Sequence, residues 1–459
     1  MVALTQLLLN ARDALSAQSF GIGVTGQNVT NVNTTGYVRR DANLATRVGG
    51  GVVAVGIRRA ADQFLDRRWF AATGASGSAS EREGQLSGVE SLFADAQGTG
   101  LGDAISGVFD AFQTLSQNPS DPTARQGVLD KAAHLTTRLN DTANAIAERR
   151  QELLQKAQAA VAEVNAKASE VAQLNRQIAA AEARGEDASD LIDQRNQLIL
   201  GISSLVDVRT FQDGNGDPVL QAAGTTLVEG DVAATFSLDL AADGSLRLWA
   251  QSSGPPATEV TAGLSGGKLA GLKEVRDTDL VELGDRVDQL AWDVASAINT
   301  AHAAGFGLDG VGGRVLFALP PSASGAARQI AVDPTLLGHP DRVAASSSAA
   351  TVPGGSDNAV ALAGLADDLV ASGGTRTASE AWADVVGDFG TRLARARDTA
   401  ETRSGVLAQT EAMRQSESGV SLDEEMVNLT KFQHAYDASA KVLATVDELM
   451  RELIDKVGR

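Results

Sequence analysis

The chain has 459 residues, of which 43% are hydrophobic and only 4% aromatic, a composition that suits long alanine-rich helices better than a compact enzyme core. Its formal net charge of -19 argues against a nucleic-acid surface, because phosphate binding needs clustered lysine and arginine side chains. The length allows two or three domains, and the absence of cysteine excludes disulfides and thiol catalysis.

The N-terminal residues 1–22 carry apolar side chains at every seventh position. This repeat is typical of a helix that packs along a coiled-coil seam, and its two rows contain Leu4, Leu8, Leu15 and Ile22. The apolar run at 7–9 has no positive segment before it and is soon interrupted by charged residues, so we expect no secretory signal. No window of about twenty apolar residues occurs in the sequence, and we therefore expect no membrane span.

A polar stretch, GQNVTNVNTTGYVRR at 26–40, follows this helix. The glycines at 21–26 match G-x-G-x-x-G, but a dinucleotide site needs a strand before the glycines and a helix after them. Here a helix precedes the glycines and asparagines follow, so we interpret them as a flexible end of the first helix. The sequence therefore predicts a helix that ends near the glycines and a polar loop after it.

The middle of the chain changes from a helical to a strand pattern. No Gly or Pro occurs between Gly127 and Gly185, which predicts one continuous helix roughly 85 Å long. A second helical run, LIDQRNQLILGISSLV, follows, and from Val206 apolar residues alternate with polar ones. In ATFSLDLAADGSLRLW the alternation flanks an Asp-Gly pair at 243–244, which predicts a β-hairpin inside a β domain that ends near Gly263.

Helical pattern returns at 269–302, is broken by Gly- and Pro-rich residues 305–356, and resumes as a nearly uninterrupted helix at 379–456. The C-terminal part of that helix has a second seam with intervals of seven. One row contains Leu422, Leu429, Tyr436, Leu443 and Met450, and the companion row contains Phe432, Val446 and Leu453. Glu425 and Ser439 are polar interruptions of the companion row.

The sequence offers no pattern with catalytic or metal-binding chemistry. DGNGD at 213–217 starts like a calcium loop, but Pro218 and Gly224 stand where that loop needs a glycine and a bidentate glutamate, so a turn between two strands is favoured. The histidines at 134, 302, 339 and 434 are scattered and have no metal-ligand spacing. We therefore expect no enzyme activity, no cofactor and no metal.

The two ends of the chain need cover for their apolar rows. A helix of about twenty residues is marginal alone in water, and the C-terminal seam is its obvious partner within the chain. Because a two-helix coil leaves half of each helix uncovered, we expect the pair to pack further against copies of the same chain. The alternative is an ordinary intramolecular helical hairpin at the end of a monomer.

Four segments resemble a known family. QNVTNVNTTGYVRR at 27–40 resembles the N-terminal signature of the bacterial flagellar axial proteins, and SGVSLDEEMVNLTKFQHAYDASAKVLATVDELMREL at 418–453 resembles their C-terminal end. DASDLIDQRNQLILGISSLVDVR at 187–209 and SGGKLAGLKEVRDT at 265–278 are similar to the hook-associated members of that family, at the junction of hook and filament. The family usually has Asn at the position of Gln27 and often Gln at the position of Arg40.

The resemblance implies a structural subunit that self-associates into a tubular layer between hook and filament, with the terminal helices lining an axial channel. Its partners would be the hook protein and the next hook-associated protein or filament subunits, with an export chaperone on the C-terminal helix. The chain would pass unfolded through the flagellar type III export apparatus and be secreted to the extracellular flagellum. The Asn- and Thr-rich segment would cross to neighbouring subunits, with Tyr37 as an anchor and Arg39 and Arg40 meeting acidic neighbours.

Other interpretations remain open at this point. Another flagellar axial protein, such as a flagellin-like or hook-like subunit, would share the two ends but should lack LIDQRNQL and GGKLAGL. A non-flagellar coiled-coil interaction protein would explain the heptads alone, without the Asn-rich Gly-Tyr segment.

The predicted fold is mainly α with inserted β: a long-helix bundle, a terminal coiled coil formed by both chain ends, and a small β domain in the middle of the chain. The predicted domains are a terminal coiled coil (1–35 with 425–459), a helical bundle (36–205 with 264–305 and 355–424), a β-rich insertion (206–263) and an irregular Gly- and Pro-rich insertion (306–354). The predicted assembly interface consists of Leu4, Leu8, Leu15, Ile22, Asn28, Asn31, Asn33, Gly36, Tyr37, Arg39, Leu422, Leu429, Phe432, Tyr436, Leu443, Val446, Met450 and Leu453.

Overall fold

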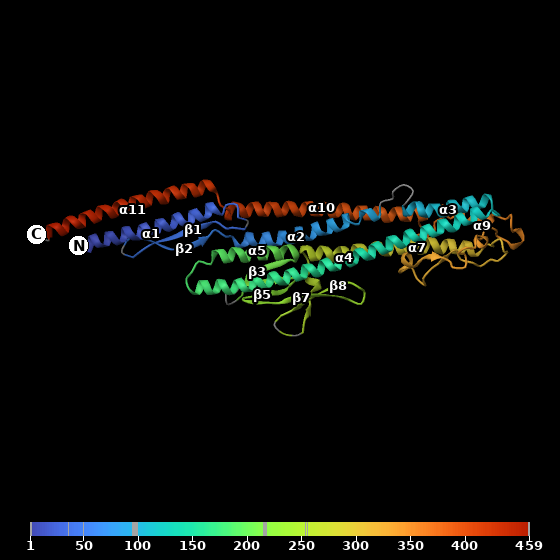
Figure 1. Cartoon of the computed structure of the whole chain (residues 1–459), viewed down its shortest axis with the longest axis horizontal. Helices are drawn as coiled ribbons and strands as arrows, with labels where there is room; N and C mark the ends of the chain where they lie inside the picture. Colours follow the sequence, from blue (N-terminus) through green and yellow to red (C-terminus); the bar gives the residue numbers. More distant parts are fainter. Residues whose placement is uncertain are drawn as a thin grey trace.

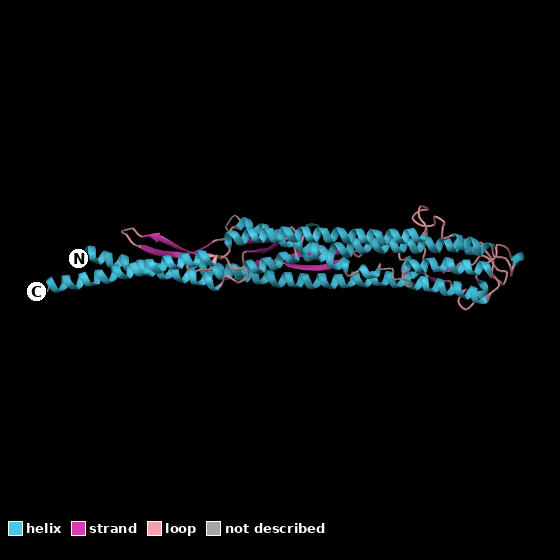
Figure 2. Cartoon of the chain, turned by 90° about the horizontal axis from the view of Figure 1, so that it is seen from above, coloured by secondary structure: helices cyan, strands magenta, loops and turns pink. Residues whose placement is uncertain are grey.

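The protein is an elongated rod with both chain ends at the same end (Figure 1). The computed structural model describes residues 2–34, 36–48, 50–93, 100–213, 218–252, 254 and 256–457. Long helices run along the rod in both views, and the strands lie beside them in small sheets (Figure 2). The predicted mainly helical fold with a small β domain in the middle is therefore confirmed.

The bundle is built from six long helices among the described residues. They are α2 (Gln63–Ser87), α3 (Leu101–Gln117), α4 (Pro122–Ala183), α5 (Ser189–Leu205), α7 (Leu280–Ala303) and α10 (Ala378–Ser418). The predicted continuous helix is confirmed as α4, whose 62 residues span about 93 Å. Asp121 accepts a hydrogen bond from the Thr123 amide at its start, and Pro122 occupies its first turn, so local sequence fixes where α4 begins.

Glycines allow α6 (Gly267–Glu274) to lie very close to its neighbours. A Cβ built on Gly271 would stand 2.5 Å from the Ser78 carbonyl oxygen of α2, and one on Gly267 would stand 2.2 Å from the Val206 amide nitrogen. Gly267 also has a φ of +75°, which disfavours any other residue. The SGGKLAGL segment therefore fits this contact because glycines, which have no side chain, stand at the two positions where α6 meets α2 and the end of α5. A π-helical turn, Val275–Asp279, joins α6 to α7.

The predicted β domain forms two small antiparallel sheets beside α4. One has the order β3-β4-β5-β6 (Val208–Gln212, Pro218–Ala222, Thr225–Glu229, Val232–Ala233) and the other the order β7-β8-β9 (Thr235–Leu240, Leu246–Gln251, Thr258–Glu259). The hairpin predicted around 243–244 is confirmed, because β7 pairs antiparallel with β8. Most of DGNGD, residues 214–217, lies outside the described residues, between the antiparallel strands β3 and β4.

One amide side chain fixes the second sheet to the bundle. Asn165 of α4 donates to the Phe236 carbonyl at 2.8 Å and accepts from the Phe236 amide at 2.8 Å. The side chain thus occupies the two backbone groups that β7 would otherwise offer to another strand. Asn299 of α7 makes the same kind of contact with the carbonyl and amide of Phe317.

The Gly- and Pro-rich segment at 306–354 closes the far end of the rod. It contains the short elements β10 (Phe317–Ala318), α8 (Ala326–Gln329) and β11 (Ala331–Val332), two short helical turns (Pro340–Arg342 and Ala349–Thr351), and side chains that are fully buried. The helix α9 (Asp357–Gly364) follows the segment. His302 fastens it to α7: Nδ1 lies 2.7 Å from the Arg314 carbonyl and Nε2 accepts from the Ala344 amide at 3.0 Å. The segment has little regular structure, and its side chains are nevertheless packed.

Two parts of the N-terminal region differ from the sequence-based predictions. Helix α1 (Val2–Thr30) continues past the glycines at 21–26, so the prediction that the helix ends there is wrong. Residues 40–59, predicted to begin the helical bundle, instead form an antiparallel hairpin of β1 (Arg40–Thr46) and β2 (Val52–Arg59) that lies along α1 (Figure 1). The C-terminal helical run is also divided, because α10 ends at Ser418 and α11 (Leu422–Val457) starts after a short break.

Candidate assembly interface

The two ends of the chain pack on each other as an α1–α11 pair that projects from the bundle (Figure 1). Small residues make close contact possible, since a Cβ on Gly21 would stand 2.6 Å from the Phe432 ring. The buried side chains of α1 are likewise small or of medium size: Ala11, Ala17, Val24, Thr25 and Asn28. The two predicted seams, on α1 and α11, thus pack against each other within one molecule.

The predicted seam residues differ in how much of their surface is covered. Val446 is buried at 4% exposure, whereas Leu422 and Tyr436 are exposed at 48% and 40%. Half-buried side chains along the seam are those of Leu4, Leu8, Leu15, Ile22, Leu429, Phe432, Leu443, Met450 and Leu453. The companion row, not the row that starts at Leu422, therefore lies nearest the centre of the pair.

Glu425 occupies a polar position within that central row and is buried at 2% exposure. Burial raises the pKa of its carboxyl group, and the hydrogen bond with Asn28 and the charge of Arg39 offset only part of that effect. Asp41 of the hairpin and Glu424 of the same helix raise this pKa further. The acid that the sequence marked as an interruption is thus a buried contact between α11, α1 and the hairpin.

Asn28 joins the end of α1 to the start of the hairpin. Its Nδ2 donates to the Arg40 carbonyl at 2.8 Å, and its Oδ1 accepts from the Arg40 amide at 3.0 Å and from the Tyr37 hydroxyl at 2.9 Å. Asn28 is part of the helix and not of a loop, so it binds the backbone of a strand in the same way as Asn165 and Asn299. The contact predicted to cross to neighbouring subunits is made here inside one chain.

A tight turn, which we call the signature turn (Asn31, Thr34, Gly36 and Tyr37), then reverses the chain. The Asn31 side chain donates to the Gln27 carbonyl and accepts from the Thr34 hydroxyl, whereas Asn33 is exposed. Gly36 has a φ of +82°, and a Cβ there would overlap the side-chain amide of Gln197 on α5. The glycine of the Gly-Tyr pair is therefore needed both for the turn and for the approach to LIDQRNQL.

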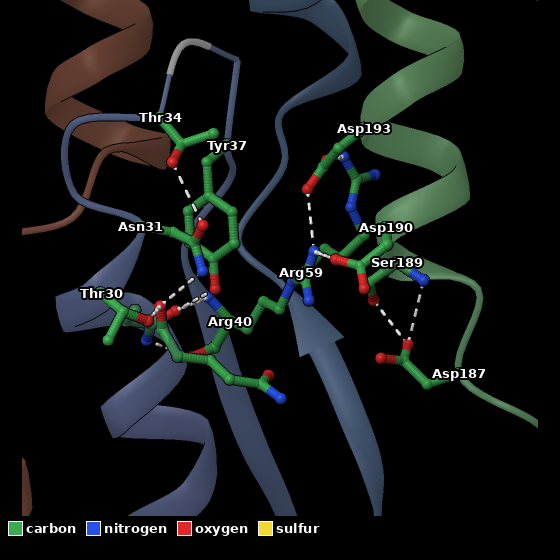
Figure 3. Close-up of polar contacts among 12 residues, drawn as sticks. Thr30, Asn31, Thr34, Tyr37, Arg40, Arg59, Asp187, Ser189, Asp190 and Asp193 are labelled. Carbon is green, nitrogen blue, oxygen red and sulfur yellow. Dashed lines mark hydrogen bonds and ion pairs between the residues drawn. The ribbon is translucent and has the colours of Figure 1, made fainter.

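Buried ion pairs connect the hairpin to the bundle (Figure 3). Arg40, whose side chain is 3% exposed, donates to Asp190 at 2.6 Å and to Asp193 at 3.0 Å, and Arg59 also donates to Asp193. Burial opposes the charged form of Arg40, but the hydrogen bonds that it donates to the two aspartates outweigh this effect and raise the pKa of the guanidinium. The Arg40 guanidinium also lies 4.8 Å from the centre of the Tyr37 ring.

Arg39 turns to the opposite side and meets the C-terminal helices. Its guanidinium donates to Glu424 at 2.8 Å, and its backbone amide donates to the Ser418 carbonyl at 2.9 Å. Arg39 and Arg40 were expected to meet acidic neighbours across the assembly, and in the single molecule they bind acidic groups of the same chain. We call this region, where Asn28, Arg39, Arg40, Arg59, Asp193 and Glu425 meet, the joint.

Sequence reasoning missed several residues of the joint. Asp193 and Arg40 are separated by 153 positions, Glu425 had been set aside as a break in a row, and Arg59 lies in a hairpin that was not predicted. The available signal was LIDQRNQL itself, in which Asp193 stands among apolar and amide residues. The spacing within that segment does not predict that the partner of Asp193 is an arginine.

A groove of about 850 Å³ opens between the signature turn and helices α4 and α5. Its lining is rich in side-chain amides, among them Gln173 and Gln177 of α4 and Gln194 and Gln197 of α5. We call it the amide groove.

Apolar side chains also remain on the outside of the terminal pair. On α11 the exposed ones include Val427, Val442, Leu449 and Ile454, and on α1 Leu7 is 48% exposed. Among the described residues, no group of three or more His, Asp or Glu side chains is arranged to hold a metal ion, and no described helix combines the length and apolar character that a membrane span needs.

Comparison with known proteins gives matches along nearly the whole chain. Residues 86–317 match the family described as "Flagellar hook-associated protein FlgK helical domain", and residues 414–456 match "Flagellar basal body rod FlgEFG protein C-terminal". The chain is 26% identical over 552 aligned positions to flagellar hook-associated protein 1 of Escherichia coli, covering 98% of this chain and all of that protein. It is 27% identical to the protein of the same name from Bacillus subtilis, covering 98% of each.

A solved structure shares the fold. The flagellar hook junction protein FlgK from Burkholderia pseudomallei superposes with a TM-score of 0.69 at 17% sequence identity, covering 77% of this chain and all of that one. The arrangement of long helices with small sheets in the middle is thus found in a second protein.

Proposed function

The chain belongs to the flagellar hook-associated protein FlgK family, and from that membership we propose that it is a structural subunit of the bacterial flagellum at the junction of hook and filament. In this role it self-associates into a tubular layer to which the filament attaches. The observation that carries the proposal is the α1–α11 pair, which covers one seam and leaves apolar side chains outside it.

The outer apolar residues of α11 support self-association. Val442 and Leu449 are each close to half exposed on one flank of the helix. Covering the remaining surface of such a side chain contributes about 1 kcal/mol, and the same contact repeats in every copy of a closed layer. Copies of the chain are suitable partners because each brings the same apolar flank.

Further partners follow from the same surface. We propose that the hook protein binds one side of the layer, and that the next hook-associated protein or filament subunits bind the other. A chaperone that covers α11 before export would shield the same side chains, and passage through the flagellar type III apparatus to the extracellular flagellum completes the proposal. Assembly then requires that the outer apolar side chains of α11 be released from the chaperone.

Electron microscopy of cells that lack the gene tests the proposal. We expect hooks without filaments and flagellin shed into the medium, both reversed by the wild-type gene. Normal filaments in the deletion strain would reject a role at the junction. They would also reject the alternative of a flagellin-like or hook-like subunit that the filament requires.

Variants of the exposed flank test whether α11 is the surface used. Val442→Asp and Leu449→Asp should each leave the secreted monomer folded and abolish filament attachment, because a charge would be buried between copies. Val360→Asp on α9 is the matched control, since Val360 is 55% exposed but lies at the far end of the rod. Equal loss of filaments in all three variants would remove the reason for assigning assembly to α11.

A further inference from the structure

The tip of the β1–β2 hairpin carries side chains that the described part of the same molecule leaves largely uncovered. We define the hairpin tip as Arg47, Val48, Gly50 and Gly51. Val48 is fully exposed, and the Arg47 side chain is 61% exposed although it reaches Asp13 at 2.8 Å. The Val48 side chain at the end of the hairpin is therefore open to contact with a second copy.

The amide groove is a surface of matching character. Its exposed glutamines at 173, 177 and 194 make no hydrogen bond to any described residue, and Leu174 and Leu198 add apolar surface among them. Elsewhere in the chain, amide side chains hold extended backbone: Asn28 holds Arg40 and Asn165 holds Phe236, each by the amide and carbonyl of one residue. Free amides around a groove of about 850 Å³ are therefore suited to an extended backbone segment.

The charges of the two surfaces are complementary. Glu170 lines the groove and is exposed, and the Asp190 side chain is 79% exposed despite its bond to Arg40. Lys167 also lines the groove, but its ammonium group lies 3.5 Å from the carboxylate of Glu163 on the same helix. The hairpin tip brings Arg47, and Arg12 stands beside it with a side chain that is 64% exposed. Opposite charges at the rim favour this pairing and fix its orientation more than its strength.

One molecule cannot bring these two surfaces together. The tip lies against the α1 residues Asn10 and Asp13, and a Cβ on Gly51 would stand 3.2 Å from the Asn10 side chain. The groove starts at Asn31, about 30 Å further along the helix axis at 1.5 Å per residue. Because α1 is a continuous helix and the hairpin lies along it, the groove can receive a tip only from another copy.

We infer that the hairpin tip of one copy docks into the amide groove of the next copy in the assembled layer. The inference rests on the proposed function, since it requires copies arranged side by side with an axial offset. In this arrangement Val48 is covered by the groove, Arg47 meets Glu170 or Asp190, and the groove glutamines bind the tip backbone. Each copy both gives a tip and receives one, so the contact links the copies into a continuous series.

Disulfide cross-linking tests the inference without background, because the natural chain has no cysteine. Flagella are isolated from cells that make the full chain with Val48→Cys and Gln177→Cys, oxidised, and separated on gels without reductant. A disulfide needs the two Cα atoms within about 7 Å, so the pair separated within one molecule can link only between copies. We expect a ladder of dimers, trimers and larger species, whereas each single variant gives at most dimers.

The matched control combines Val48→Cys with Val360→Cys, which keeps the number of exposed thiols but moves one of them to α9. Filaments present with no ladder, or with a ladder no stronger than the control, overturn the inference and leave the proposed function standing. Absence of any effect of the gene on filaments would instead overturn the proposed function. Should the double cysteine variant fail to assemble, Arg47→Glu and Glu170→Arg provide a second test: each alone should reduce filament retention, and the combination should restore it; no restoration counts against the docking.

Discussion

Removing the Asp193 carboxylate should release the hairpin from the bundle, whereas removing that of Asp190 should not. Both aspartates bind Arg40, but the Asp193 side chain is 11% exposed and that of Asp190 is 79% exposed. In Asp193→Ala, Arg59 loses its carboxylate partner in the joint and Arg40 keeps only the exposed one. Leaving a buried charge without its partner costs about 3 to 5 kcal/mol, and the retained Asp190 places the expected loss at about 3 kcal/mol.

Asp190→Ala is the control because it alters the same arginine. Its carboxylate is exposed to solvent and salt, so its loss should cost at most about 1 kcal/mol. The two variants change the same charge and the same number of atoms. The difference between them therefore isolates the effect of burial.

Hydrogen exchange measured by mass spectrometry gives the local free energy. A two-stranded hairpin is marginal alone, so its amides should exchange once it leaves α5. At about 1.4 kcal/mol per factor of ten, a loss of about 3 kcal/mol makes peptides from 40–59 exchange roughly 100-fold faster in Asp193→Ala. Peptides from α7 serve as the internal reference and should not change. Equal rates in the two variants would refute the assignment of Asp193 as the residue that holds the hairpin.

Three further predictions concern one more buried residue of the joint, Glu425, and two buried positions of the bundle, His302 and Gly271. The pKa of Glu425 is raised in the folded state, so the stability that this group contributes is complete below the ordinary glutamate pKa and is lost as pH rises through the higher folded value. Glu425→Gln should therefore stabilise α1 and α11 against proteolysis at neutral pH and lose that advantage in acid. Burial lowers the pKa of His302, so the stability it contributes is complete above about pH 6.5 and is lost as pH falls further; exchange of peptides from 306–346, corrected for intrinsic rates, should accelerate at pH 5.5. Gly271→Ala should lower the free energy of unfolding, measured in urea, by about 1 to 3 kcal/mol because the new Cβ meets the Ser78 carbonyl. Gly284→Ala is the control: the nearest atom to its Cβ lies at 3.8 Å, and the change should raise the same free energy by up to about 1 kcal/mol.

Regular elements of this fold were predictable because their signals are local. The absence of Gly and Pro between 127 and 185 predicted α4, the Asp-Gly pair predicted the β7–β8 hairpin, and rows at intervals of seven predicted that the chain ends pair. Each pattern depends on residues that are near one another in sequence, so tertiary contacts were not needed to identify it.

The joint was not predictable because its contacts join distant residues. Asn28 and Thr30 follow a run of glycines and resemble a helix end. The helix nevertheless continues, because the Asn28 side chain is hydrogen-bonded to the Arg40 backbone and to Glu425. Residues 40–59 have glycines and mixed polar residues instead of a clean alternation, so the hairpin depends on α1 beneath it. Small residues such as Gly21 also decide which row lies at the centre of the pair, since Phe432 packs against the space that Gly21 leaves.

The joint is polar where the bundle core is apolar, and this difference has a physical consequence for assembly. An apolar joint would attract the exposed valines and leucines of α11, such as Val442, and compete with other copies for them. Ion pairs and amide contacts at Arg40, Asp193 and Asn28 do not compete, because an aliphatic side chain cannot replace a hydrogen-bonded carboxylate. Directional bonds also fix the angle at which the α1–α11 pair leaves the rod, which apolar packing alone specifies less tightly. The terminal pair is therefore held in position by one class of interaction while a different class remains free for its neighbours.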